Sequence, residues 1–125
     1  MTHDPSHDGF WLDQYLPDRL FLDQHEVPSI RSITKILGAS KVLPVPIPFD
    51  CHDGFYGAYW RRPQAYLDPN VRRNISLFAR LRDTAGAMKR LSNDLSTGLW
   101  HQQFGHYEKL TFLDLGYCLL VCRLA

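Results

Sequence analysis

Residues 50–63 form the most unusual stretch of the chain, with the sequence Asp-Cys-His-Asp-Gly-Phe-Tyr-Gly-Ala-Tyr-Trp-Arg-Arg-Pro. The stretch combines aromatic rings with a histidine, two carboxylates and two arginines. Such a set of side chains could wall a pocket with a few polar groups that orient a ligand. The same set is also typical of an aromatic loop that packs over the end of a sheet, so both interpretations stay open.

Other candidate sites are weaker. Three histidine–aspartate pairs invite comparison with a metal site: His3-Asp4, His7-Asp8 and His52-Asp53. No third ligand follows at a diagnostic spacing, so we expect solvated loop residues and no metal. Cys51 lies beside His52 in the sequence. A catalytic nucleophile and its base must be close in space, but neighbours in an extended loop usually point apart. We therefore expect Cys51 to be a loop or packing thiol.

The turn from Gly54 to Gly57 is not a phosphate-binding loop. It has two of the glycines that a dinucleotide-binding turn needs, but Phe-Tyr stands between them, and the chain has no Walker A sequence. The chain therefore contains no recognisable turn that could cradle a nucleotide or cofactor.

The helices that must position these residues are predicted from caps and apolar spacing. Ser29 is placed as an N-cap and Gly38 as the stop of a helix that buries one apolar stripe. Asp68 followed by Pro69 is a strong start for a second helix. Residues 1–10 are expected to form a loop. The predicted helices cover residues 11–24 in pieces, 29–38, 69–82 and 84–98.

Two strands are predicted, at residues 41–47 and 117–122. The first contains prolines at alternate positions, which cannot donate to a ladder, so we expect regular pairing on one side only. The second is almost continuously apolar and suits a strand that is buried on both faces, with Cys118 and Cys122 as buried, reduced thiols. Helix, strand, helical excursion and strand form an α/β order with too few strands for a complete sheet.

Composition narrows the class of protein. A length of 125 residues allows one domain or part of one, and 45% hydrophobic with 22% charged residues is ordinary for a globular chain. The 14 basic and 13 acidic residues give a net charge of +1, which does not point to nucleic acid. No apolar run is long enough to span a membrane, and the polar, acidic N-terminus does not read as a secretory signal. We therefore expect a cytoplasmic protein.

Four blocks of sequence carry a family resemblance: residues 10–17, 44–55, 59–69 and 113–117. Together they resemble the C-terminal half of bacterial class I S-adenosylmethionine-dependent methyltransferases, over nearly the whole chain. The resemblance implies an α/β fold with a partial Rossmann-like sheet. Its fifth strand would lie at 41–47 and its final antiparallel strand, at 116–124, would be inserted beside the fifth. A helical substrate-side excursion would occupy 50–105.

The resemblance also implies which part of a methyltransferase domain this chain supplies. Residues 1–125 would be the C-terminal part of a single methyltransferase domain, without the half that carries the glycine-rich loop and binds S-adenosylmethionine. Such a part could contribute the wall for a small-molecule acceptor, but we do not expect it to bind the cofactor or to be active alone. By position, the substrate-contacting candidates are Trp11, Asp53, Tyr59, Trp60 and Arg61, and His52 is a candidate general base because imidazole titrates near neutrality.

An alternative is a non-catalytic binding module that associates through an exposed sheet edge and the aromatic loop. On either interpretation, the strand at 117–122 leaves apolar faces and edges open when the chain is alone. We therefore expect dimerisation, aggregation or marginal stability. The expected partners are the other half of the domain or a second copy of the chain, together with a small-molecule substrate, and neither nucleic acid nor membrane.

Overall fold

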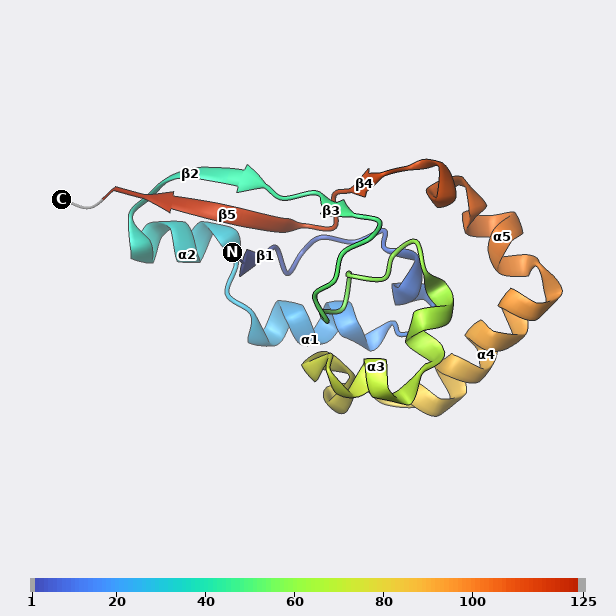
Figure 1. Ribbon diagram of the computed structural model, residues 1–125. Helices are drawn as coiled ribbons and strands as arrows, with labels where there is room; N and C mark the ends of the chain where they lie inside the picture. Colours follow the sequence, from blue (N-terminus) through green and yellow to red (C-terminus); the bar gives the residue numbers. More distant parts are fainter. Residues whose placement is uncertain (1, 124–125) are drawn as a thin grey trace.

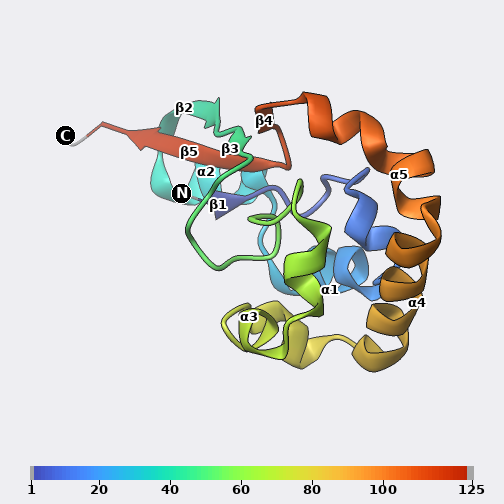
Figure 2. The same cartoon turned by 45° about the vertical axis from the view of Figure 1, so that its right-hand side comes forward.

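A ribbon of two long strands extends from a helical lobe in the computed structural model of the protein, which describes residues 2–123 (Figure 1). Turning the molecule by 45° shows α4 and α5 along the outer side of the lobe (Figure 2). In chain order the elements are β1 (Thr2–His3), η1 (Trp11–Gln14), α1 (Asp18–Glu26), α2 (Ile30–Leu37), β2 (Ala39–Pro44), β3 (Ile47–Pro48), η2 (Pro63–Leu67), α3 (Pro69–Arg73), η3 (Ser76–Arg80), α4 (Thr84–Thr97), α5 (Leu99–Phe104), η4 (Gly105–Lys109), β4 (Phe112–Leu113) and β5 (Tyr117–Cys122), where η marks a 3-10 helix.

The last strand lies in the middle of the sheet. The strand order is β1-β5-β2, and β5 runs antiparallel to both neighbours, so β1 and β2 are parallel to each other. Thr2 and Pro44 lie opposite Cys118 from its two sides. A second pair, β3 with β4, continues the ribbon toward the helical lobe with Ile47 opposite Leu113.

The position of β1 differs from the expectation, because residues 2–3 form a strand within the segment that was predicted to be a loop. The two predicted strands, at 41–47 and 117–122, pair with each other as β2 and β5. However, β5 is inserted between two parallel strands, and each of them flanks it. The fifth strand of the methyltransferase resemblance can therefore be matched to β1 as well as to β2.

The capping residues set the bounds of α2 as predicted. The Ser29 hydroxyl accepts a hydrogen bond from the Ser32 backbone N–H at 3.1 Å, and Gly38 ends the helix with φ of 63°, a conformation that favours glycine. The predicted buried stripe is wrong: no residue of α2 is buried, Ile30 and Ile33 are half-buried, and the Leu37 side chain is 56% exposed. This helix packs on the ribbon alone, so part of its apolar surface has no cover within the described chain.

The helix predicted over 69–82 is broken. Asp68 caps its start by accepting from the Asn70 backbone N–H at 2.8 Å, but α3 ends at Arg73. Ile75 then takes extended backbone angles and buries its side chain before η3 begins. Ile75 and Phe78 are both buried, and their spacing of three residues is also the spacing at which a single helix buries one face.

Tryptophans form the centre of the helical lobe. Trp11, Trp60 and Trp100 have no exposed surface, and the Trp11 ring meets Trp100 edge-on at 5.2 Å between centroids. The Trp11 indole N–H donates to the Trp60 carbonyl oxygen at 2.7 Å, and the Trp60 indole N–H donates to the Ile47 carbonyl oxygen at 3.0 Å. These two bonds join η1, the aromatic loop at 50–63 and β3.

The ribbon of β2 and β5 has one face turned toward α2 and one bare face. Residues that pair across two strands share a face, so Leu43 with Leu119, and Lys41 with Val121, lie together. Their side chains are exposed: 44% for Leu43, 45% for Leu119 and 38% for Val121. We call these three apolar residues the bare face. Helix α2 lies on the opposite side, where Ile30 borders a small cavity that Val42 also lines.

Two expectations for β5 are therefore corrected. The strand is not buried on both faces within the described chain, because the bare face has no helix over it. Cys118 is buried, as expected, but Cys122 is exposed near the end of the ribbon. Both cysteines and the half-buried Cys51 are free thiols.

The tryptophan hydrogen bonds give a first prediction. Substitution Trp11→Phe keeps a ring in place but leaves the buried Trp60 carbonyl without its donor, which should lower the free energy of unfolding by about 1–3 kcal/mol. Urea denaturation followed by circular dichroism measures the change. Tyr107→Phe is the control, because its hydroxyl donates to Gly9 O at 3.4 Å on the surface. Equal effects of the two substitutions would contradict the prediction that the buried tryptophan hydrogen bond contributes more to stability than the surface bond.

The bare face gives a second prediction. The isolated chain should self-associate with rising concentration, and Leu119→Lys should shift it toward monomer by placing a charge on the apolar surface. Sedimentation velocity measures the distribution. Leu99→Lys is the matched control, since Leu99 is 38% exposed but lies on α5, away from the ribbon. A wild-type chain that stays monomeric across the concentration range would refute the prediction.

Candidate functional site

The carboxyl ends of the two parallel strands meet at one edge of the sheet. β1 ends at His3, which lies opposite Tyr117, and β2 ends at Pro44. The Val45 backbone N–H then donates to the Tyr117 carbonyl oxygen at 2.8 Å, which holds the end of β2 against the start of β5. In open α/β sheets, ligands bind in the crevice outside the carboxyl ends of the strands. This edge is therefore where a ligand site is expected.

A cavity of about 300 Å³ lies at this edge, and we call it the edge cavity. Its walls come from four parts of the chain: the sheet, α1, the aromatic loop and the segment around η3. The residues that carry its chemistry are His3, Asp23, Phe55, Tyr56, Arg80 and Tyr117. The remaining lining is mainly apolar, so the cavity combines apolar walls with a few polar groups.

The aromatic loop reaches the sheet at Gly57. A Cβ atom added there would lie 2.9 Å from Leu115 Cδ1, so only glycine allows this approach without a shift of its neighbours. The Gly57 backbone N–H lies 3.3 Å from the Tyr117 hydroxyl oxygen and donates to it. The Phe55 ring stands edge-on to the Tyr117 ring at 4.9 Å. These contacts fix the aromatic wall of the edge cavity.

A buried arginine organises the carboxylates beneath the cavity. The Arg19 side chain, only 3% exposed, donates from Nε to Asp13 Oδ1 at 2.8 Å and from Nη1 to Asp23 Oδ2 at 2.9 Å. The Tyr56 hydroxyl also donates to Asp13, at 3.0 Å. Burial, together with the Asp13 charge, raises the pKa of Tyr56 well above its ordinary value, so this hydroxyl stays protonated at neutral pH.

His3 lies between this network and the sheet. Its Nε2 is 3.0 Å from the Leu115 carbonyl oxygen, and its Nδ1 is 3.7 Å from Asp23 Oδ2. The ring packs against that of Tyr117 at 4.7 Å. Burial lowers the pKa of His3 below 6.5, an effect that the Leu115 carbonyl and Asp23 oppose only in part. The imidazole is therefore neutral at physiological pH. Burial also raises the pKa of Tyr117, to about 12.

The six residues that the sequence suggested lie in different environments. Trp11 and Trp60 are fully buried in the lobe, where their indole N–H groups donate to backbone carbonyls. Tyr59 and Arg61 are half-buried. The Tyr59 ring meets Tyr66 edge-on at 5.5 Å, and the Arg61 guanidinium lies over the Phe49 ring at 4.4 Å. These four residues hold the aromatic loop against its surroundings.

His52 and Asp53 are exposed at the tip of the same loop. None of the six suggested residues lines either the edge cavity or the larger cavity described below. Their roles toward a substrate stay predictions. The loop contributes the neighbouring residues instead, because Gly54, Phe55 and Tyr56 line the edge cavity.

The edge cavity is lined by residues that the sequence alone did not group together. His3 had been weighed with its neighbour Asp4, whereas in space it faces Asp23, on α1. One sequence signal pointed to this network: Asp23 and Arg19 are four residues apart, the spacing at which side chains meet on one face of a helix.

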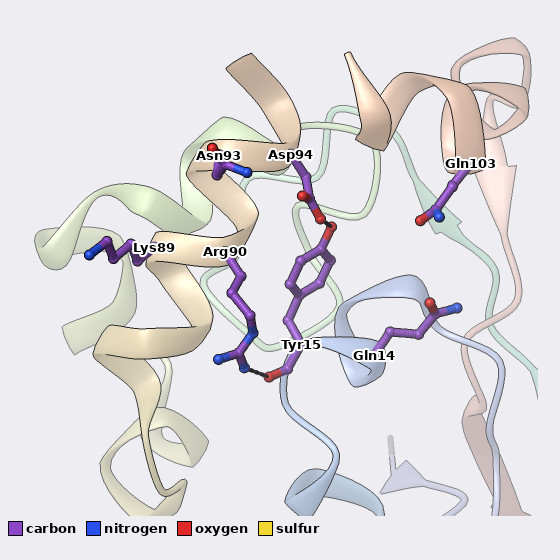
Figure 3. Close-up of a pocket in the computed structure, with 7 residues that line it drawn as sticks. All are labelled: Gln14, Tyr15, Lys89, Arg90, Asn93, Asp94 and Gln103. Atoms are coloured by element: carbon purple, nitrogen blue, oxygen red, sulfur yellow. Dashed lines mark hydrogen bonds between the residues drawn. The ribbon is translucent and has the colours of Figure 1, made fainter. Parts of the chain in front are cut away.

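A larger cavity, of about 470 Å³, lies on the outside of the lobe between η1 and the helices α4 and α5 (Figure 3). The Tyr15 hydroxyl donates to Asp94 Oδ2 at 2.6 Å, and Arg90 donates to the Tyr15 carbonyl oxygen at 3.2 Å. Figure 3 shows the Lys89 side chain directed away from Tyr15. The central polar groups of this larger cavity are thus paired with one another, and the sheet contributes no residue to its lining. We therefore favour the edge cavity as the candidate ligand site.

Within residues 2–123, no helix has the length and apolar character that a membrane crossing requires. Over the same residues, no group of three or more His, Cys, Asp or Glu side chains is arranged to hold a metal ion.

The chain is similar to a solved structure of a protein from Anabaena variabilis ATCC 29413, which is provisionally assigned as a methyltransferase from an antibiotic biosynthesis pathway. The two structures superpose with a TM-score of 0.83 and share 29% sequence identity. The match covers 94% of this chain and 50% of that protein, so the chain spans about half the length of its structural relative. No family model matches the chain, and none of the curated proteins does.

This likeness agrees with the resemblance in the sequence. The mixed helix-and-sheet fold of the chain matches that of a protein provisionally assigned as a methyltransferase. The large share of this chain in the match means that the ribbon, the aromatic loop and the helical lobe belong to one common arrangement.

The buried histidine gives a third prediction. In a titration followed by NMR, the His3 ring should titrate below 6.5. The unfolded chain binds more protons than the folded chain between that midpoint and 6.5, so the free energy of unfolding should rise with pH across this window. His3→Gln should remove the rise, while His106→Gln, at an exposed position, should keep it.

A further variant checks the cause of the shift. Asp23→Asn removes a carboxylate that raises the pKa of His3, so the midpoint should move lower still. A wild-type midpoint above 6.5, or an upward movement in Asp23→Asn, would contradict the described environment.

Proposed function

We propose that this chain is the substrate-side, C-terminal portion of an S-adenosylmethionine-dependent methyltransferase domain that transfers a methyl group to a small-molecule acceptor. The observation that carries the proposal is the structural match, in which 94% of this chain aligns with half of a protein assigned as a methyltransferase. The edge cavity supports it, because about 300 Å³ of space at the carboxyl end of β1, beside β5, suits a small acceptor.

The residues described here do not fit the cofactor. A nucleotide-binding turn needs closely spaced glycines between a strand and a helix, so that the backbone can approach the ligand. The glycines with positive φ lie singly along the chain, at Gly9, Gly38, Gly98 and Gly116. We therefore place the S-adenosylmethionine site outside these 125 residues, and we expect no binding of the cofactor by this chain alone.

The bare face supports a docking surface for that other half. It is apolar, and the chain accounts for only half of its structural relative. The occupant that we propose is the portion of a methyltransferase domain that corresponds to the remaining half. Burial of Leu43, Leu119 and Val121 would stabilise the assembly by removing apolar surface from water.

The alternative is a non-catalytic module that associates with itself through its sheet edge and aromatic loop. The same bare face favours it, because a second copy could cover the exposed leucines as well as another half-domain could. The two proposals differ in what binds the face and in whether S-adenosylmethionine binds after assembly.

A complementation experiment tests the proposed function. The 125-residue chain is mixed with the half of the Anabaena protein that lies outside the match. We expect a one-to-one complex on size-exclusion chromatography, and calorimetric binding of S-adenosylmethionine by the complex but not by this chain. Leu43→Lys, on the bare face, should weaken the complex, whereas Leu99→Lys should not.

Two outcomes would contradict the proposal. Binding of S-adenosylmethionine by the 125-residue chain alone would contradict the placement of the cofactor site elsewhere. A stable homodimer that excludes the added half, and that dissociates in Leu43→Lys, would favour the non-catalytic module.

A further inference from the structure

Two acceptor atoms face each other at the polar end of the edge cavity. The Leu115 carbonyl oxygen can only accept, so the His3 nitrogen that lies 3.0 Å from it, Nε2, carries the hydrogen in the neutral ring. Nδ1 then carries the lone pair, and it lies 3.7 Å from Asp23 Oδ2, which is also an acceptor. Neither His3 Nδ1 nor Asp23 Oδ2 can donate to the other, and a ligand hydroxyl would supply the missing donor.

The same arrangement gives each ring N–H of His3 a partner once the ring has gained a proton. A proton on Nδ1 faces the Asp23 carboxylate, while Nε2–H continues to donate to Leu115. Arg19 holds Asp23 in position through its bond at 2.9 Å and is itself neutralised by Asp13. The charged groups near the ring are therefore fixed before a ligand enters, which is the preorganisation that proton transfer requires.

The other walls indicate what carries the hydroxyl. Phe55, Tyr56 and Tyr117 present aromatic rings, and Ile75 and Leu77 add apolar surface. Flat aromatic ligands pack on such walls through stacked or edge-on contacts. The Tyr117 hydroxyl accepts from Gly57 at 3.3 Å, and burial keeps it protonated at neutral pH, so it does not compete with His3 as a base.

Resting on the proposed function, we propose that the methyl acceptor is an aromatic hydroxyl compound that binds in the edge cavity, and that His3 accepts its proton at Nδ1. In this step the O–H bond of the acceptor breaks and its electron pair stays on oxygen. The proton forms the Nδ1–H bond, and the resulting imidazolium lies beside Asp23. The oxygen becomes the stronger nucleophile that methyl transfer needs.

The probe for this inference is 4-nitrophenol, which absorbs visible light only as the phenolate. The 125-residue chain is titrated with it at a pH below the pKa of the free phenol, and bound probe is measured separately by equilibrium dialysis. We expect bound probe to be enriched in phenolate. In His3→Gln the phenolate-to-phenol ratio of bound probe should fall about tenfold, the change that one pKa unit represents. His106→Gln, at an exposed position on η4, should behave as wild type.

A measurement on the wild-type chain removes any dependence on the folding of the variant. The ¹⁵N resonance of His3 Nδ1 should move toward the protonated position when 4-nitrophenol is added, with shifts at Phe55 and Tyr117. An unchanged Nδ1 resonance, or the same phenolate ratio in His3→Gln, would overturn the inference. Probe bound at the bare face instead, shown by shifts at Leu43 and Leu119 alone, would also overturn it.

This result is separable from the proposed function. Proton uptake by His3 without cofactor binding in the complemented complex would sustain the phenol site and contradict the methyltransferase. Cofactor binding by the complex without proton uptake by His3 would sustain the methyltransferase and overturn the hydroxyl acceptor.

Discussion

The hydrogen bond from the Trp11 indole to the Trp60 carbonyl oxygen, at 2.7 Å, is the contact on which the arrangement of the lobe depends. Trp60 donates in turn to Ile47 in β3, so a single buried residue links the first helical turn, the aromatic loop and the ribbon. An unpaired polar group in this interior would cost far more than a surface bond. The position of the loop against the sheet, and with it the aromatic wall of the edge cavity, follows from these two bonds.

The molecule is well packed at one end and open at the other. The lobe buries its three tryptophans completely, whereas the ribbon leaves one face uncovered and α2 exposes Leu37. The edge cavity lies at the junction, with His3 and Tyr117 on the sheet and Phe55 on the loop. The well-packed lobe therefore positions the wall that Phe55 forms. The wall that His3 and Tyr117 form belongs to the ribbon, so it is held more firmly when the bare face is covered.

Local chemistry made some elements predictable. Ser29 and Gly38 satisfy the backbone groups at the two ends of α2, so their types were enough to bound it. The break after Arg73 was not predictable from spacing, because two short helices can bury apolar residues at the same positions as one long helix. Burial of β5 was overestimated. Its apolar sequence suits a strand that is covered on both faces in a complete domain, whereas the described chain leaves one of those faces bare.

The candidate site was harder to foresee than the helices. The sequence placed the chemistry on an aromatic loop with His52 and Asp53, yet these two residues are exposed and do not line the edge cavity. The contact between His3 and Leu115 spans 112 residues, and only the topology of the sheet brings them together. Long-range pairing of this kind has no local sequence signal.

The central place of β5 also bears on how the chain folds as it is synthesised. In the strand order β1 and β2 are joined only through β5, which is synthesised after both of them. The lobe and its tryptophans can form earlier, but the sheet cannot close until the final strand enters between the other two. During that interval β2 carries two unpaired edges, which leave it open to pairing with other chains.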